Sequence, residues 1–352
     1  MPLTEELAAR IRATGPLTMA DYMAECLTHP RYGYYTTRDP LGGTGDFTTA
    51  PEISQMFGEL AGLWLAQCWL DRGAPAPFHL VELGPGRGTL MADMLRATAR
   101  VPGFQDALDL HLVETSPVLR QRQKQTISRP VTHHDRFDTV PDGPLFLVVN
   151  EFFDALPIRQ FEREDDHWRE RVVGLQGPDL TVGLSAPIQP PFGDDRQTDT
   201  RPGDIVEHCE AGRTIAALIG DRIAQFGGVA LIIDYGDWRS LGDTLQAVRN
   251  HLPVPVLDTP GSADLTAHVD FEALAHAAAP VRASRLTPQG VFLERLGITQ
   301  RAQSLARSLS GEALENHIAA HRRLTHPDEM GTLFKAMALF HKDSPLPAGF
   351  AP

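Results

Sequence analysis

The sequence has little of several features that define protein classes. It contains only three cysteines in 352 residues, Cys26, Cys68 and Cys209, and their spacing matches no zinc motif. Sparse cysteines are typical of a reducing compartment, where they act as small buried hydrophobes. We therefore expect a cytoplasmic protein without structural disulfides.

Long apolar runs are also missing. No stretch approaches the roughly 18 consecutive apolar residues of a membrane span. The first residues, MPLTEE, are acidic and lack the basic region and apolar stretch of a secretory signal. We expect neither a membrane span nor a cleaved signal peptide.

Positive charge is scarce as well. The formal net charge is −13, and lysine occurs only at Lys124, Lys335 and Lys342. General nucleic-acid binding requires basic patches that displace counterions from phosphates, so it is not expected here. The acidity is compatible with a basic partner, such as a protein segment that presents arginine or lysine, and equally with a role in solubility alone.

A glycine-rich turn is the most informative feature that is present. The apolar run before it includes Glu82, and Gly84, Gly86 and Gly88 follow at alternate positions. Glycines at a strand-to-helix turn leave room for a nucleotide-like cofactor against the main chain and the following helix N-terminus. The dinucleotide pattern G-x-G-x-x-G places its last glycine one residue later, and Glu82 would repel a pyrophosphate. Glu82 would instead attract a sulfonium cofactor with a free amino group, so the turn favours S-adenosyl-L-methionine. A nicotinamide dinucleotide and a turn without a ligand are the alternatives.

Strand-like and helical patterns alternate from about residue 78 onward. This alternation predicts an α/β fold with a doubly wound, mostly parallel sheet, whose ligands bind at the carboxyl ends of the strands. The expected strands are 78–83, 109–114, 144–150, 228–235 and 332–341, and the expected helices between them are 91–99, 117–126 and 212–226.

The surrounding segments predict additional parts. We expect a helical N-terminal cap and cofactor lid at 1–74, with a loop at 41–49 and a helix at 51–70. A core at 75–284 follows, with an antiparallel insertion near 158–205 in which 159–184 alternates like strands. A helical substrate-side insertion at 285–330, with a helix that starts at 292 and ends at 309, precedes a final core strand and tail at 331–352.

Polar side chains follow each predicted strand. Glu114 is placed to accept hydrogen bonds from both ribose hydroxyls, with Ser116 beside it, and Asp135 could bind the adenine amino group. A single acid in such a position could simply cap the next helix, but a series of them favours a cofactor site. We expect no metal site, because His268 and Asp270 lack a third ligand and His133 and His134 are better explained as polar residues at a strand end.

Several long segments carry a resemblance to a known family. They are 16–23, 29–35, 45–54, the turn at 84–88, 150–157, 264–271 and 329–335. Over nearly its whole length the chain resembles the MidA-like S-adenosylmethionine-dependent methyltransferases, although Ala50 stands where the family often has serine. The resemblance implies a class I, Rossmann-like methyltransferase fold, S-adenosyl-L-methionine as cofactor and a protein arginine as acceptor. The family's mitochondrial member is an arginine methyltransferase that acts in respiratory complex I assembly, so a complex I subunit or its bacterial counterpart is the implied substrate.

Arginine methylation needs carboxylates near the transferred methyl group. A guanidinium stays protonated at physiological pH, and carboxylates can orient it and accept its proton. The loop after the strand at 144–150 supplies Glu151 and Asp154 as predicted catalytic residues, with Asn150 holding the acceptor nitrogen. Asp234 and Asp270 are secondary candidates. Asp154 could instead cap a helix, and Glu151 could instead bind the cofactor.

The segment before residue 55 offers a second candidate. Thr48, Thr49 and Glu52 are predicted to form a lid over the methionine end of the cofactor. A plain helix N-cap followed by Pro51 is the alternative, and both can hold at once.

Two further functions remain open at this point. One is a small-molecule methyltransferase on the same fold, and the other is a non-catalytic adenosylmethionine-binding assembly factor. The sequence leaves the oligomeric state open, a dimer included, and does not reveal the acceptor or the degree of methylation.

Overall fold

A computed structural model describes residues 2–37, 48–193 and 195–351 of the chain. The predicted loop at 41–49 and the resemblance segment at 45–54 therefore lie partly outside the described residues. Within the described part, contacts divide the chain into two compact units. Unit 1 comprises 1–47, 154–213 and 239–270, and unit 2 comprises 48–153, 214–238 and 271–352.

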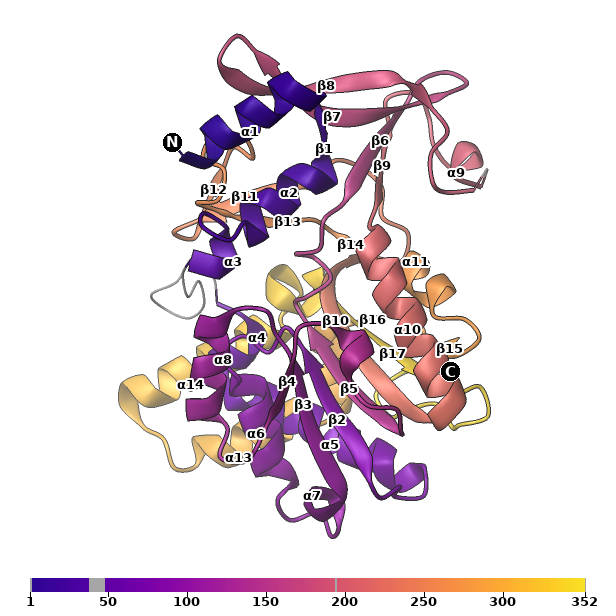
Figure 1. Cartoon of the computed structure of the whole chain (residues 1–352). Helices are drawn as coiled ribbons and strands as arrows, with labels where there is room; N and C mark the ends of the chain where they lie inside the picture. Colours follow the sequence, from indigo (N-terminus) through magenta and orange to yellow (C-terminus); the bar gives the residue numbers. More distant parts are fainter. Residues whose placement is uncertain (1, 38–47, 194, 352) are drawn as a thin grey trace. The chain divides into compact units, whose positions relative to one another are not determined.

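Unit 2 contains the central sheet that the sequence predicts. Figure 1 shows its parallel strands side by side, and their order is β15-β17-β10-β5-β2-β3-β4, with β16 also paired to β17. Only parallel pairs join β4, β3, β2, β5 and β10, whereas β17 is antiparallel to β10. The strands are β2 (Phe78–Leu83), β3 (Leu108–Val113), β4 (Thr132–His134), β5 (Leu145–Asn150), β10 (Gly228–Asp237), β15 (Arg282–Ala283), β16 (Thr287–Pro288) and β17 (Phe334–Phe340).

The chain order of these strands sets the position of a ligand crevice. The chain runs from β2 outward to β3 and β4, then returns to β5 on the other side of β2. In open α/β sheets, ligands bind outside the carboxyl ends of the strands where the order reverses in this way. The crevice is therefore expected beside the ends of β2 and β5.

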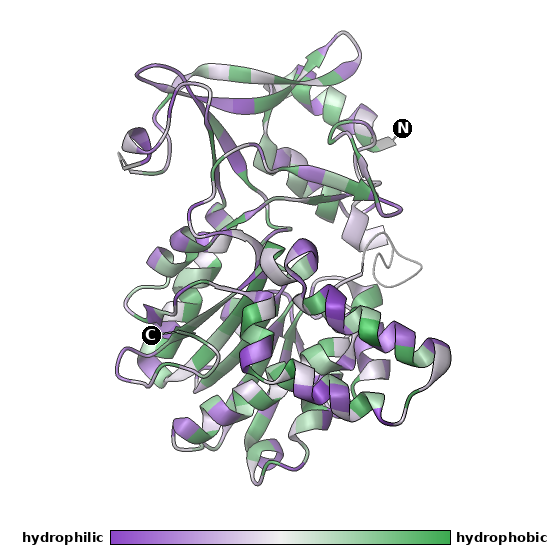
Figure 2. Cartoon of the chain, turned by 180° about the vertical axis from the view of Figure 1, so that it is seen from behind, coloured by the Kyte–Doolittle hydropathy of each residue, from purple (hydrophilic) through white to green (hydrophobic). Residues whose placement is uncertain are grey.

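The helices of unit 2 pack around this sheet. They are α4 (Ala50–Ile53), α5 (Gln55–Asp71), α6 (Thr89–Thr98), α7 (Phe104–Ala107), α8 (Pro117–Thr126), α10 (Glu210–Phe226, which starts in unit 1), α11 (Phe271–Ala277), α12 (Gln289–Arg295), α13 (Ile298–Ala306) and α14 (Gly311–Thr325). Short 3₁₀ and π turns lie at Phe137–Thr139 and Pro327–Gly331. Figure 2 shows hydrophobic residues concentrated in the strands of the sheet.

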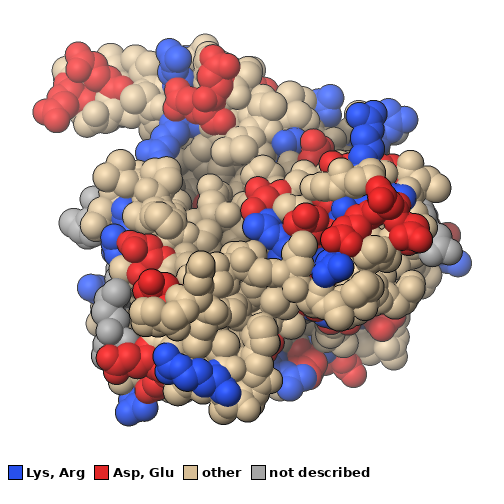
Figure 3. Space-filling view, turned by 90° about the horizontal axis from the view of Figure 1, so that it is seen from above, with Lys and Arg blue, Asp and Glu red and all other residues tan. Residues whose placement is uncertain are grey.

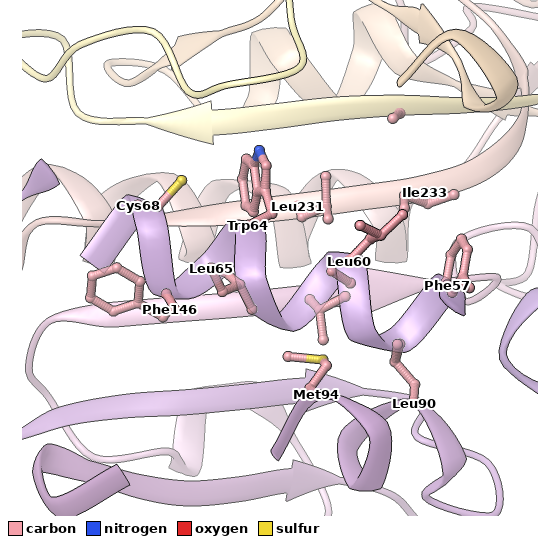
Figure 4. Packing of buried hydrophobic residues seen from close by; sticks show 14 of the residues in the cluster. Phe57, Leu60, Trp64, Leu65, Cys68, Leu90, Met94, Phe146, Leu231 and Ile233 are labelled. Atoms are coloured by element: carbon pink, nitrogen blue, oxygen red, sulfur yellow. The ribbon is translucent and has the colours of Figure 1, made fainter. Parts of the chain in front are cut away.

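Helix α5 belongs to the core of unit 2. Its buried side chains, among them Phe57, Trp64 and Leu65, share one cluster with Phe146 of β5 and Leu231 of β10, as Figure 4 shows. Apolar residues occur on most sides of this helix, so other elements of unit 2 must cover it on most sides. The predicted N-terminal cap at 1–74 is consequently divided, with α4 and α5 in unit 2 and the earlier helices in unit 1.

Unit 1 combines helices with antiparallel strands. Its elements are α1 (Pro2–Thr14), β1 (Leu17–Thr18), α2 (Met19–Thr28), α3 (Tyr34–Thr37), β6 (Arg159–Arg163), β7 (Trp168–Gln176), β8 (Asp179–Ile188), α9 (Asp195–Thr198), β9 (Ile205–His208), β11 (Gln246–Arg249), β12 (Leu252–Val254), β13 (Asp264–Thr266) and β14 (Val269–Asp270). One sheet has the order β1-β7-β6-β9 with β8 on β7, and a second has the order β12-β11-β13. The antiparallel pattern predicted for 159–184 is thus present, but it joins the N-terminal helices in one core.

Two predicted helices are interrupted. The segment 292–309 breaks at Gly297, whose φ of 90° starts α13 as a left-handed cap. The segment 51–70 breaks at Ser54, which is extended and accepts a hydrogen bond from the Met56 amide to begin α5. Glycine and serine are favoured at such helix starts, so local capping outweighs the apolar period here.

Candidate active site

The glycine turn has the backbone that only glycine adopts readily. Gly84, Gly86 and Gly88 have φ values of 62°, 51° and 84°. A Cβ on Gly84 would lie 2.8 Å from the Phe152 ring, so a side chain there would clash. Gly88 caps α6, whose first amides therefore face the turn.

Glu82 lies at the end of β2, beneath this turn. It is buried, and burial raises the pKa of its carboxyl to about 8, with the nearby Glu114 charge adding to the rise. Its Oε2 atom has no hydrogen-bond partner among the described residues. A buried carboxylate oxygen is normally paired, so this atom calls for a cationic or donor group from a ligand.

Glu114 and Ser116 follow β3 as predicted. Glu114 Oε1 accepts a 2.8 Å hydrogen bond from the Ser116 amide, and the Ser116 hydroxyl accepts one from Leu119 at the start of α8. Ser116 therefore acts here as a helix cap. Direct binding of the cofactor by either residue stays a prediction.

Gln123 of α8 was not among the site residues predicted from the sequence. This fully buried side chain donates from Nε2 to the Gly86 carbonyl at 2.7 Å and to Glu114 Oε2 at 3.4 Å. Its Oε1 lies 2.8 Å from His133 Nε2. Gln123 thus connects the glycine turn to the end of β3. The sequence signal that could have identified it is a polar amide at a position on the buried side of the helix at 117–126.

Asp135 is placed differently from the other acids. Its side chain is 78% exposed and forms a 2.6 Å ion pair with Arg120 of α8. Contact with an adenine amino group stays a prediction, and would have to occur alongside this ion pair.

The predicted lid residues contact the glycine turn through Glu52. Its Oε1 accepts a 2.6 Å hydrogen bond from the Thr89 hydroxyl at the start of α6, and its Oε2 lies 4.0 Å from Arg87. Thr49 is the N-cap residue of α4 but makes no side-chain cap bond, and Thr48 precedes it. Thr49 therefore occupies the N-cap position of a helix, as the alternative interpretation of this segment expects. A function of the segment as a lid stays a prediction.

Glu151 follows β5 in a left-handed conformation, with φ of 49°. Its Oε1 accepts hydrogen bonds from the Ala50 amide at 2.9 Å and from Asn150 Nδ2 at 3.1 Å. Burial raises the pKa of this carboxyl to about 7, although these donors and the Arg323 charge act in the opposite direction. A non-glycine residue with positive φ is uncommon and is often found at functional sites.

Asp234, a secondary candidate from the sequence, positions the loop after β5. Its Oδ2 accepts hydrogen bonds from the amides of Phe152 and Phe153 at 3.1 and 3.0 Å, and the side chain is completely buried. The backbone that carries Glu151 is thereby fixed to the end of β10.

Asp154 is assigned to unit 1, whereas Asn150 and Glu151 are assigned to unit 2. It is buried, and its carbonyl accepts a 2.9 Å hydrogen bond from Ala267. Burial raises the pKa of Tyr35, and the Asp264 and Asp154 charges raise it further, so these three side chains lie in one region of unit 1. Within the described residues, His268 donates its amide to Thr244, and Asp270 ends β14.

The fold and this edge of the sheet define a class of protein. A doubly wound sheet with an antiparallel β17, a glycine turn over a buried acid and polar residues after each parallel strand form the cofactor site of a class I methyltransferase fold. The buried, unpaired Oε2 of Glu82 beside the glycine turn fits a donor group of S-adenosyl-L-methionine.

The chain belongs to the S-adenosyl-L-methionine-dependent methyltransferase family whose model, described as "Putative S-adenosyl-L-methionine-dependent methyltransferase", matches residues 60–289. It is 37% identical to the protein arginine methyltransferase NDUFAF7 homolog of Drosophila melanogaster, over 96% of this chain and 84% of the relative. It is also 37% identical to the Homo sapiens protein arginine methyltransferase NDUFAF7, over 96% and 83% of the two chains. Both relatives are described as mitochondrial.

A solved structure supports the same assignment. A Burkholderia thailandensis protein, described as a "likely methyl transferase" and bound to S-adenosyl-homocysteine, superposes with a TM-score of 0.83 at 26% identity. The superposition covers 99% of this chain and 94% of that one. The chain is therefore an S-adenosyl-L-methionine-dependent methyltransferase with the predicted Rossmann-like fold.

Two properties bear on the partner. Among helices in the described ranges, none combines the length and apolar character needed to cross a bilayer. On the face that Figure 3 shows, acidic and basic side chains form separate small groups between larger uncharged areas.

Proposed function

We propose that this methyltransferase modifies arginine side chains of a protein, and that Glu151 accepts the proton released from the guanidinium. The named activity of its relatives supports an arginine acceptor. The single observation that carries the proposal is the Glu151 carboxyl, which follows β5 and has a pKa raised to about 7.

Such a carboxyl has suitable proton affinity for this reaction. A general base works best when its pKa is near the operating pH, because it is then largely ionised but still binds a proton well. The Ala50 and Asn150 donors both bind Oε1, which orients the carboxylate. Asn150 contributes its own side-chain carbonyl, whose Oδ1 is buried without a partner in the described chain.

When bound, S-adenosyl-L-methionine supplies an activated methyl group on a sulfonium. Methyl transfer is a displacement in line with that bond, so positioning of the acceptor nitrogen provides much of the rate. Asp234 contributes by fixing the Phe152 and Phe153 amides, and thereby the backbone next to Glu151. The binding of the non-reacting guanidinium nitrogens by Asp154, which belongs to unit 1, stays a prediction from the sequence.

A respiratory complex I subunit, or its bacterial counterpart, is the candidate acceptor, and the cytoplasm is the proposed compartment. The acceptor is an extension of the family relationship, whereas the compartment is inferred from the sparse cysteines of the sequence alone. A small-molecule acceptor is the second candidate, because the same fold also serves methyltransferases that act on small molecules.

Mass spectrometry of a deletion strain tests the acceptor. The parent, the deletion and two complemented strains, one with the native gene and one with Glu151→Gln, are compared for methyl-arginine peptides and for methylated metabolites. We expect at least one methyl-arginine peptide to disappear on deletion and to return only with the native gene. Loss of a methylated metabolite with every methyl-arginine peptide retained would establish the small-molecule alternative instead.

A further inference from the structure

Three ligand-type side chains meet at the amino-terminal ends of β2 and β3. His79 is directly opposite Asp109 in the parallel register, and His111 lies two residues further along β3. Because side chains alternate along a strand, all three project from the same face of the sheet. That face is opposite to the one on which Phe78, Leu80 and Leu110 join the large core cluster.

This group is separate from the cofactor edge. Glu82 and Glu114 lie at the carboxyl ends of the same two strands. Three residues separate His79 from Glu82 along β2, which corresponds to about 10 Å at the rise of a strand. The methyltransferase site therefore does not use these side chains.

The three donor atoms form a compact triangle. His79 Nδ1 and His111 Nε2 are 3.0 Å apart, His111 Nε2 and Asp109 Oδ2 are 3.1 Å apart, and His79 Nδ1 and Asp109 Oδ2 are 3.8 Å apart. A tetrahedral ion with bonds of about 2.0–2.1 Å needs ligand atoms about 3.3–3.4 Å apart. The three distances between the donor atoms lie on both sides of this value.

The hydrogen bonds on the far side of His111 determine its tautomer. The Thr139 hydroxyl donates to the Arg136 carbonyl at 2.8 Å, so it can only accept from His134 Nδ1 at 2.9 Å. Neutral His134 then has a bare Nε2, which accepts from His111 Nδ1 at 3.0 Å. Neutral His111 consequently presents the lone pair of Nε2 to the triangle.

His79 is oriented in a similar way. Its Nε2 lies 3.3 Å from the Asp142 carbonyl, which can only accept, so the ring proton belongs on Nε2. The Nδ1 lone pair then faces His111 Nε2 and Asp109 Oδ2. In these tautomers, two imidazole lone pairs and one carboxylate oxygen converge.

The other ring nitrogen of each histidine already has a hydrogen-bond partner, His134 Nε2 for His111 and the Asp142 carbonyl for His79. Neutral imidazole is the form that binds metal ions, and a histidine ligand commonly donates its other ring N–H to a fixed acceptor. His134 and the Asp142 carbonyl are such acceptors for His111 and His79.

We propose that His79, Asp109 and His111 bind a divalent transition-metal ion, with Zn²⁺ the best match, at the amino-terminal ends of β2 and β3. Two imidazole nitrogens and one carboxylate oxygen are a common zinc donor set. The Asp109 side chain is 54% exposed, so water can occupy the fourth position. The ion would connect two neighbouring strands of the sheet and stabilise the fold without taking part in methyl transfer.

The test uses full-length, tag-free protein stripped with a chelator and then dialysed against Co²⁺ or Zn²⁺. We expect one equivalent of bound metal, the visible absorption of four-coordinate Co²⁺ and a higher melting temperature with Zn²⁺. Asp109→Asn should weaken binding at least tenfold, and His111→Asn should abolish it. Asp179→Asn, an exposed carboxylate at the start of β8, serves as the matched control and should bind like the native chain.

The folding of each variant is checked by circular dichroism. If His111→Asn does not fold, the exposed Asp109 variant alone decides the result. Less than 0.1 equivalent of metal in the native protein at 10-fold molar excess would overturn the proposal. Equal binding by Asp109→Asn and the native chain would also overturn it.

Discussion

At the scale of single residues, Glu151 decides the proposed chemistry. Glu151→Gln keeps an oxygen for the Ala50 amide but cannot accept a proton, so we expect cofactor binding to persist while turnover falls by about 100-fold or more. In the native enzyme, turnover at saturating cofactor should rise with pH through a value of about 7, because the ionised carboxylate is the active form. Steady-state kinetics from pH 5.5 to 9 measure both effects. Glu312→Gln on α14 is the exposed control, and native turnover by Glu151→Gln would remove this residue from the mechanism.

Asp154 is tested separately, because it belongs to unit 1. If it binds the guanidinium, Asp154→Asn should abolish measurable transfer and leave calorimetric binding of adenosylmethionine within about threefold of native. Full turnover by this variant would show that Asp154 has only a structural role near Tyr35 and Asp264.

Glu82 should make cofactor-free protein less stable as the pH rises. Its folded-state pKa of about 8 exceeds the usual value of 4.5, so its stabilising contribution is complete below about pH 4.5 and is lost as the pH rises through 8. Relative to native protein, Glu82→Gln should therefore gain stability between pH 5 and pH 8.5, by about 4 kcal/mol. Urea unfolding of both proteins at each pH measures this change, and a difference that does not vary with pH would contradict the burial argument.

At the scale of elements, α8 supports the cofactor turn through Gln123. Gln123→Leu removes the donor to the Gly86 carbonyl and leaves that group unsatisfied, which costs about 1–3 kcal/mol. We expect adenosylmethionine affinity to fall about tenfold, measured by calorimetry. Gln121→Leu, on the exposed side of the same helix, is the matched control and should bind normally.

The elements also show how far sequence reasoning reaches. The long strands β2, β3, β5, β10 and β17 and the helix at 117–126 follow from the apolar period and from the flanking glycines, which are local properties. The short strands β4, β15 and β16 were not predicted. The glycine turn and Glu82 could be predicted because their steric and charge requirements lie within seven residues. Gln123 and Asp234 could not be given their roles, since their partners are 37 and about 80 residues away and depend on packing.

At the scale of the whole molecule, the two units are built from interleaved segments. The core of unit 1 includes Leu7, Tyr22 and Met23 from α1 and α2, whereas the large cluster of unit 2 takes no described residue before Ala50. Deleting residues 2–37 should therefore expose the apolar side of the strands at 159–208 and leave the central sheet folded. Limited proteolysis with mass spectrometry should show new cleavage within 159–208 and continued protection of β5. Equal protection of 159–208 in both chains would contradict this prediction.

The sequence by itself determined the α/β class, the glycine turn and the acids that follow the strands, because backbone sterics and hydrophobic period act between near neighbours. Only the tertiary structure decided that α1–α3 join the antiparallel strands, that Asp234 fixes the backbone beside Glu151, and that His79, Asp109 and His111 converge. These outcomes depend on strand register and burial, which bring together residues that are distant in the chain.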